Sequence, residues 1–232
     1  MKIVLDSLVE GARQASGTVV IVDVYRCFTT AAVAFSRGAA KIVMVAEPDE
    51  ALGLRREGVG ELCMGEVGGK RPPGFDFGNS PSELSSADLR GKTLIQSTRA
   101  GTVGVAAARL ADHIYGGALT VADATARAVL RRGPELVTIV AMGSEGKVRS
   151  DEDEQCALYL RNLLLGRRPD RDAVRKLVLV GQESQKYGDP ATPHFPAADR
   201  EMALEIDAVP FAIGIAREGG LLVARPEQAS PP

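Results

Sequence analysis

Short apolar runs alternate along the chain with amphipathic or Ala-rich stretches. The runs are rich in β-branched residues and predict strands, whereas the stretches between them repeat with a helical period. Strands are expected at residues 2–5, 18–24, 41–45, 61–64, 93–96, 113–115, 136–141 and 211–216. Helices are expected at residues 27–37, 48–56, 80–85, 102–109, 120–131, 151–165 and 173–180. This alternation predicts an α/β fold, a three-layer α/β/α sandwich with a mostly parallel or mixed sheet.

The run from Val19 to Val22 is apolar at every position, as in a central strand that helices cover on both faces. Folds of this kind bind ligands at the carboxyl ends of their strands, where helix N-termini present N–H groups to anions. No clear linker interrupts the chain, so residues 1–232 are expected to form a single domain, which could be built from two similar halves. Prolines predict a turn-rich loop at 189–198, and residues 225–232 are expected to be a frayed tail.

Composition narrows the classes of function. The 232 residues are 45% hydrophobic and carry a net charge of −2, which is enough for one sizeable core. Aromatic residues make up only 4%, and no basic stretch has interleaved aromatics, so no nucleic-acid partner is expected. No apolar run approaches the roughly 20 residues that cross a bilayer, and the N-terminus does not resemble a signal peptide. We therefore expect a cytoplasmic protein with no membrane partner.

The cysteines do not indicate a disulfide scaffold or a zinc site. Cys27, Cys63 and Cys156 lie far apart and form no CxxC motif. Cys27 lacks the Gly-rich loop and the Arg of a cysteine phosphatase, so a buried structural thiol is favoured over a nucleophile.

Polar residues that could carry chemistry gather where the predicted strands end. Asp23 ends the strand at 18–24, and Arg26 lies in the turn before the next helix. An aspartyl-nucleophile phosphatase needs a second Asp at the position of Tyr25, so Asp23 is expected to be a metal ligand or a general base. An ion pair between Asp23 and Arg26 is the structural alternative.

A second cluster follows the strand at 61–64. Glu66 comes first, and Asp76, Asn79 and Ser80 then precede a helix that a proline opens. Asn79 or Ser80 could simply cap that helix, but capping leaves the two carboxylates unexplained.

A third cluster, QSTRAGT at 96–102, lies between a strand and an Ala-rich helix. Thr98, Arg99, Gly101 and Thr102 could form an oxyanion cradle, with helix entry as the alternative. The chain has no phosphate-loop signature and no GxGxxG motif.

The fourth cluster is acidic and begins the helix at 151–165. Acidic residues in a first turn favour the helix dipole, but four in succession are more than that effect needs. Glu152 and Asp153 are the two that we expect to face a site.

The ordered set VDVYRCFTTA, GEVGG, FDFGNSP, STRAGT and EDEQCA resembles the 2-phosphosulfolactate phosphatase family over residues 19–156, with a weaker echo in EIDAVPF. The resemblance implies a magnesium-dependent phosphoric monoester hydrolase associated with coenzyme M biosynthesis. STRAGT departs from the TTNGT common in the family, because Arg99 and Ala100 replace Thr and Asn. An added guanidinium indicates a more anionic substrate or a changed anion position.

The resemblance also implies roles for individual residues. The expected catalytic residues are Asp23, Arg26, Glu66 and Asp76. The resemblance carries over Asn79, Ser80, Gly101 and Thr102 as expected substrate-binding residues, and the oxyanion cradle described above adds Thr98 and Arg99. The expected Mg²⁺ ligands are Asp23, Glu66, Asp76, Glu152 and Asp153.

The expected reaction is hydrolysis of 2-phosphosulfolactate, or of a related 2-phospho carboxylate, by a metal-activated water. Arg26 and Arg99 would hold the anionic groups of the substrate. A non-catalytic sensor of a phosphorylated or sulfonated metabolite is the alternative function. A homodimer is also expected, and the Ala-rich stretch 103–111 could form its interface or could equally pack on the sheet.

Overall fold

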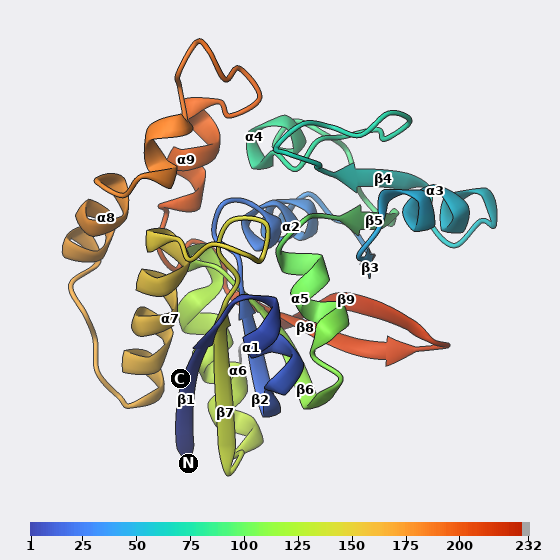
Figure 1. The fold of residues 1–232 in the computed structure, drawn as a ribbon. Helices are drawn as coiled ribbons and strands as arrows, with labels where there is room; N and C mark the ends of the chain where they lie inside the picture. Colours follow the sequence, from blue (N-terminus) through green and yellow to red (C-terminus); the bar gives the residue numbers. More distant parts are fainter. Residues whose placement is uncertain (229–232) are drawn as a thin grey trace.

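The computed structural model describes residues 1–228, and within them a nine-stranded mixed sheet forms the centre of the molecule (Figure 1). Its strands are β1 Lys2–Ser7, β2 Ser16–Val22, β3 Lys41–Val45, β4 Leu62–Gly65, β5 Thr93–Ser97, β6 Leu110–Gly117, β7 Leu136–Ala141, β8 Phe211–Glu218 and β9 Leu221–Gln228. They lie in the order β1-β7-β2-β6-β8-β9-β3-β5-β4.

The sheet consists of two parallel blocks joined by an antiparallel hairpin. Strands β1, β7, β2 and β6 run parallel in one block, and β3, β5 and β4 run parallel in the other. The hairpin β8–β9 pairs antiparallel with β6 on one side and with β3 on the other. The hairpin supplies hydrogen-bonding partners to the inner edge strand of each block, so that the two blocks form one continuous sheet.

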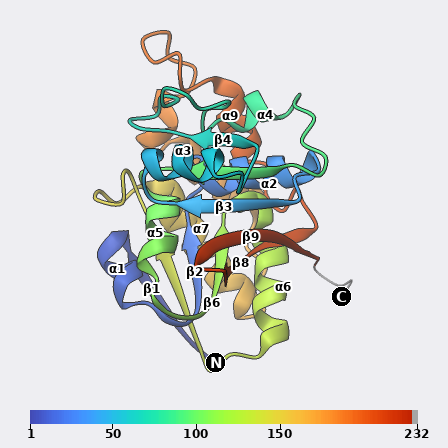
Figure 2. The same cartoon turned by 90° about the vertical axis from the view of Figure 1, so that its right-hand side faces the viewer.

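Helices pack on both faces of this sheet, as Figures 1 and 2 show. They are α1 Leu8–Gln14, α2 Cys27–Ser36, α3 Pro48–Arg56, α4 Pro81–Leu84, α5 Gly101–Ala107, α6 Ala122–Arg132, α7 Asp151–Leu164, α8 Arg171–Leu179 and α9 Ala197–Ala203. Two short 3₁₀ helices, η1 Leu119–Val121 and η2 Glu183–Lys186, complete the described elements. Among residues 1–228, none of the helices combines the length and the apolar character needed to cross a membrane.

Strand β2 shows why the layers form. Val19 and Ile21 point into a core shared by both blocks, where α2 and α5 lie between them (Figure 1). Val20 and Val22 point to the opposite face and pack against α6 and α7. All four side chains are fully buried, and each contributes about 1.5–3 kcal/mol of hydrophobic stabilisation. A separate core under α3 covers the outer face of the second block.

The predicted three-layer α/β class is confirmed, and every predicted strand and helix overlaps an observed element. The predictions missed α1, α9 and β9. The frayed tail was predicted wrongly for residues 225–228, which pair with β8 as the end of β9. Proline is rare within strands, so Pro226 argued against a strand at this point of the sequence. In the structure Pro226 nevertheless lies within β9, opposite Ile213 of β8. The remainder of the predicted tail, 229–232, lies outside the described residues.

Candidate active site

The carboxyl ends of strands from both blocks meet around one cavity of about 390 Å³. Asp23 follows β2 and Gly143 follows β7 in the first block, whereas Glu66 follows β4 and Arg99 follows β5 in the second. Helix α7 adds Glu152. The chain beyond α8 supplies the remaining wall, with Glu183, Lys186, Tyr187, Thr192 and Phe195.

Asp23 is the central carboxylate of this cavity. It is 5% exposed, and its Oδ1 accepts a hydrogen bond from the backbone N–H of Cys27 at 3.1 Å, while Oδ2 accepts one from Gly101 at 2.7 Å. Burial raises the pKa of Asp23 to about 6, and the nearby Glu66 carboxylate adds to the rise. The two N–H groups fix the carboxylate but do not neutralise it.

Gly101 is required where α5 meets α2. A Cβ atom at this position would lie 2.6 Å from the Cys27 sulfur and 2.9 Å from Oδ2 of Asp23. Cys27 itself is fully buried, and burial raises the pKa of its thiol well above the usual range. The structural interpretation of Cys27 is therefore confirmed, and Gly101 acts through its backbone N–H.

Glu152 and Asp153 differ in role although they are adjacent. Asp153 accepts backbone hydrogen bonds from Val24 at 2.7 Å and Gly143 at 2.8 Å, and so ties the ends of β2 and β7 together. Glu152 lines the cavity and is 5% exposed. Burial raises the pKa of Glu152 to about 7, with further contributions from the carboxylates of Glu183 and Asp23.

Glu66 organises the side of the cavity that the second block supplies. Its Oε1 accepts the N–H of Arg99 at 2.7 Å, and its Oε2 accepts the N–H of Gly69 at 2.8 Å. The Arg99 guanidinium donates to Oε2 of Glu47 at 3.2 Å and to the carbonyl of Ala46 at 3.4 Å. Arg99 is nonetheless a lining residue of the cavity, and its side chain is about one-third exposed.

Thr98, Thr102 and Ser80 are engaged in hydrogen bonds within the protein. The hydroxyl of Thr98 accepts the N–H of Thr102 at 3.1 Å, and the hydroxyl of Thr102 accepts the N–H of Thr98 at 2.8 Å. Ser80 caps α4 by accepting the N–H of Glu83 at 3.3 Å. The helix-entry and capping alternatives are thus confirmed for these three residues, none of which lines the main cavity.

Asn79 stands out among the predicted binding residues. Its side chain is 4% exposed, and within residues 1–228 its Oδ1 has no hydrogen-bond partner. It lines the main cavity and also an adjoining hollow of about 280 Å³. An unpaired buried amide oxygen costs about 1–3 kcal/mol, so this side chain is suited to a ligand.

The ion pair considered between Asp23 and Arg26 is not formed. The Arg26 guanidinium instead donates to Oδ2 of Asp199 at 2.8 Å. Asp199 lies in α9, which was not predicted, although the AADREM segment after Pro196 is compatible with a helix start. The lining residues Lys186, Tyr187 and Phe195 were also missed.

Asp76 is not brought to the cavity. Its Oδ2 accepts the backbone N–H of Cys63 and the guanidinium of Arg55, both at 2.8 Å. The carboxylate thereby fixes the FDFGNSP stretch against β4 and α3, and it lies outside both hollows that Asn79 lines.

Comparison with known proteins places these residues in a family. The model for 2-phosphosulpholactate phosphatase matches residues 4–187. The chain belongs to the 2-phosphosulfolactate phosphatase family. The family consists of phosphoric monoester hydrolases, so the cavity is the candidate active site of such an enzyme. The ordered motifs around Asp23, Glu66, Asn79, Arg99 and Glu152 all fall inside the matched region.

Several curated relatives carry the name "Probable 2-phosphosulfolactate phosphatase". The relative from Thermus thermophilus is 34% identical over 213 residues, which cover 89% of this chain and 87% of that protein. The relative from Deinococcus radiodurans is 37% identical over 57% of this chain and 55% of its own length. The relative from Bacillus subtilis is 33% identical over 63% of this chain and 64% of its own length.

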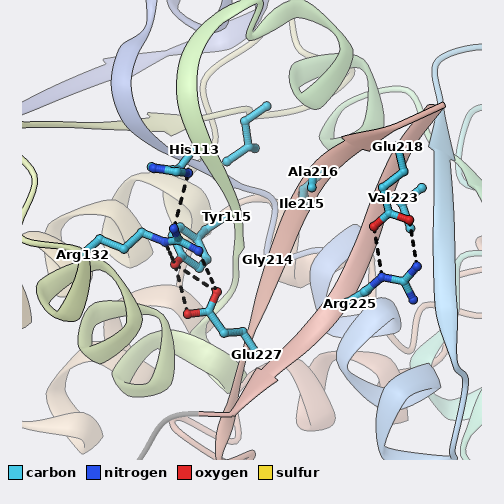
Figure 3. A pocket seen from close by; sticks show the side chains of 11 residues that line it. His113, Tyr115, Arg132, Gly214, Ile215, Ala216, Glu218, Val223, Arg225 and Glu227 are labelled. Carbon is cyan, nitrogen blue, oxygen red and sulfur yellow. Dashed lines mark hydrogen bonds and ion pairs between the residues drawn. The ribbon is translucent and has the colours of Figure 1, made fainter. Parts of the chain in front are cut away.

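Another hollow, of about 190 Å³, is lined by residues of β6, β8 and β9 and by Arg132 of α6 (Figure 3). Here Glu227 accepts hydrogen bonds from Tyr115 and Arg132, and Glu218 accepts one from Arg225 at 2.8 Å. The dashed lines in Figure 3 mark the ion pairs of Glu227 with Arg132 and of Glu218 with Arg225, so these four charged side chains already have partners. In a phosphatase of this family the hollow offers no free charge to a phosphorylated substrate, and none of the predicted site residues lines it.

Within the part of the chain that the structure describes, no group of three or more His, Cys, Asp or Glu side chains is arranged to hold a metal ion. Mg²⁺ commonly uses only one or two protein carboxylates and completes its shell with water and substrate phosphate. Asp23, Glu66 and Glu152 line the cavity, and burial raises the pKa of two of them. The donor set therefore fits a magnesium ion.

Proposed function

We propose that this chain hydrolyses the phosphate monoester of 2-phosphosulfolactate, or of a related 2-phospho carboxylate, with Mg²⁺ as its cofactor. The observation that carries this proposal is the pair of buried carboxylates Asp23 and Glu152 on one cavity, with no cation bonded to either among the described residues. Membership of the phosphatase family supports a role for these carboxylates in phosphate ester hydrolysis. Released sulfolactate would serve coenzyme M biosynthesis, as the sequence resemblance implies.

The carboxylates divide the work between them. Asp23 and Glu66 would hold the metal ion, because both line the cavity and the Glu66 carboxylate contributes to the raised pKa of Asp23. Bound Mg²⁺ would supply Lewis-acid polarisation of the phosphoryl group and compensate the buried negative charge. Asp153 stays outside this set because it does not line the cavity, and its two oxygens accept backbone N–H groups that join β2 to β7.

Glu152 would handle the proton. Its pKa of about 7 suits a group that gains and loses a proton near neutral pH. It would accept a proton from the water whose oxygen attacks phosphorus. The bond from phosphorus to the ester oxygen on C2 then breaks, and the leaving oxygen takes up that proton to give the 2-hydroxy acid and phosphate.

Two cationic side chains would hold the other anionic groups of the substrate. Arg99 and Lys186 both line the cavity; Lys186 is ion-paired with Glu183 at 2.6 Å, and Arg99 is bonded to Glu47 only through one of its terminal nitrogens. The unused N–H groups of Arg99 can therefore donate to a carboxylate or a sulfonate. Asn79 could accept or donate a further hydrogen bond through its buried amide.

The test is phosphate release from 2-phosphosulfolactate, with phosphoglycolate and phospholactate beside it, in excess Mg²⁺ and again in EDTA. We expect release in Mg²⁺, loss of release in EDTA, and recovery when Mg²⁺ is restored. If calorimetry shows tight binding of these compounds without any turnover, the chain is a sensor instead.

The division of roles has its own test. Calorimetric titration with Mg²⁺ should show weaker binding to the Asp23→Asn variant and nearly unchanged binding to the Glu152→Gln variant. The Glu152→Gln variant should lose kcat, by about 10²–10⁴-fold for a general base. Equal loss of Mg²⁺ affinity in both variants would contradict the assignment.

A further inference from the structure

One wall of the cavity comes from a segment that lies largely beyond the family match. This wall segment, residues 183–199, runs from η2 to the first turn of α9, whereas the family model ends at residue 187. It contributes Glu183, Lys186, Tyr187, Thr192 and Phe195 to the cavity lining. Figure 1 shows α9 and the loop before it beside α4, away from the strands of the first block. The wall segment therefore needs side-chain contacts to hold it at the cavity.

Asp199 makes the central contact. It is fully buried, and its Oδ1 accepts hydrogen bonds from the hydroxyl of Ser80 at 2.8 Å, the hydroxyl of Ser82 at 2.6 Å and the N–H of Ser82 at 3.0 Å. Its Oδ2 accepts one from Arg26 at 2.8 Å. A single carboxylate thus connects α9 to the start of α4 and to the turn after β2.

Arg26 completes the link from the other side. Besides Asp199, its guanidinium donates to the carbonyl of His194 at 3.0 Å and to the carbonyl of Gly69 at 3.1 Å. The same group lies 4.9 Å from the ring centre of Phe195, within cation–π range. Arg26 therefore bonds both the wall segment and the glycine loop that Glu66 holds.

The packing leaves little freedom for another arrangement. A Cβ atom on Gly69 would lie 2.3 Å from the Phe195 ring, so the ring rests directly on the glycine backbone. The ring of Tyr187 packs against Phe195 at 5.4 Å and against Tyr25 at 4.8 Å. If Asp199 lost its charge, Arg26 would remain as a buried cation without its carboxylate, a strongly unfavourable state.

We infer that Asp199 is a positioning residue, which through Arg26, Ser80 and Ser82 holds the wall segment in place so that Lys186 and Phe195 face the substrate. This inference rests on the proposed function for its substrate but not for its geometry. It assigns Arg26 mainly to this link, whereas sequence analysis expected a direct role in holding the substrate.

The experiment compares the wild type with Asp199→Asn and with the exposed control Asp172→Asn in α8, at a temperature where all three are folded. Hydrogen exchange should be about tenfold faster in residues 183–199 of Asp199→Asn and unchanged in α8. KM for 2-phosphosulfolactate should rise about tenfold while kcat stays within about threefold, since lost binding contacts raise KM alone. Affinity for inorganic phosphate in Mg²⁺, from calorimetry, should fall in parallel.

Unchanged exchange in the wall segment would overturn the inference, and so would faster exchange with unaltered KM and phosphate affinity. If the wild type does not turn over 2-phosphosulfolactate, the proposed function fails, and exchange together with phosphate affinity still decides the role of Asp199. If Asp199→Asn does not fold, Ser82→Ala decides in its place, because it keeps the ion pair and removes one bond to Oδ1. It should shift both readouts in the same direction by about threefold.

Discussion

The active-site cavity and the hollow of Figure 3 both contain carboxylates, but of these two only the cavity has buried carboxylates without an ion-pair partner among residues 1–228. In the hollow of Figure 3, Glu227 forms an ion pair with Arg132 at 3.4 Å, and Arg131, which does not line the hollow, pairs with the same carboxylate at 2.9 Å. In the active-site cavity, Asp23 and Glu152 are buried, and the described part of the chain places no Lys or Arg nitrogen in an ion pair with either. Buried charge without a partner is costly, so the cavity is adapted to a cation or a proton that arrives from outside.

The comparison also separates stability from function. Pairing in the hollow of Figure 3 links α6 to β6 and β9. The carboxylates of the cavity do the opposite, since desolvation penalises each of them in the folded state. Changes in the two places should therefore act on different measurements.

The largest effect is expected for Asp23→Asn. The amide keeps the shape of the side chain and removes the charge that we assign to metal binding, so kcat/KM should fall by about 10²–10⁴-fold. The matched control is Glu227→Gln, which removes a charge from the other hollow and should leave kcat/KM unchanged. Steady-state phosphate release from both variants checks the contrast, and similar losses in the two would remove the distinction between the hollows.

A smaller effect is expected for Glu152→Gln, which should raise the stability of the metal-free protein, whereas Asp23→Asn lowers activity. The pKa of Glu152 rises from 4.5 to about 7 on folding, so the folded state holds its proton more tightly than the unfolded state. The stability that this carboxyl contributes is fully present below about pH 4.5 and is lost as pH rises through about 7. Glutamine does not ionise, so the Glu152→Gln variant does not lose this stability as the pH rises.

Glu152→Gln should accordingly stabilise the chelated protein at pH 8 by about 2 kcal/mol, with a difference near zero at pH 4. Urea unfolding in EDTA at the two pH values gives the measurement. A variant that is less stable than the wild type at pH 8 would mean that Glu152 is compensated in the folded protein.

The smallest effect is expected for Asp76→Asn. Its carboxylate is about one-third exposed and paired with Arg55 away from the cavity, so the loss in unfolding free energy should be about 1 kcal/mol or less. Turnover should stay within about twofold of the wild type. A loss of turnover comparable to that of Asp23→Asn would return Asp76 to the catalytic set.

The sequence by itself determined the layers and the place of the chemistry. The unbroken apolar run Val19–Val22 required a strand covered on both faces, and the observed β2 is such a strand. Because Asp23 follows this strand directly and Glu66 follows β4, their position at strand ends was also fixed by local order along the chain. Helix boundaries at 48–56 were predicted well, because a proline and two acidic residues mark that start.

Only the tertiary structure decided which polar residues face the cavity. Glu152 and Asp153 are neighbours in one helical turn, so their directions differ by the helical rotation, and no composition rule tells which one meets β2. Asp76 forms an ion pair with Arg55 of α3, and the spacing of these residues along the chain does not reveal this contact. The link from Asp199 to Arg26 spans 173 positions of the sequence. Contacts at such separation depend on how the whole chain packs, and local sequence patterns carry no record of them.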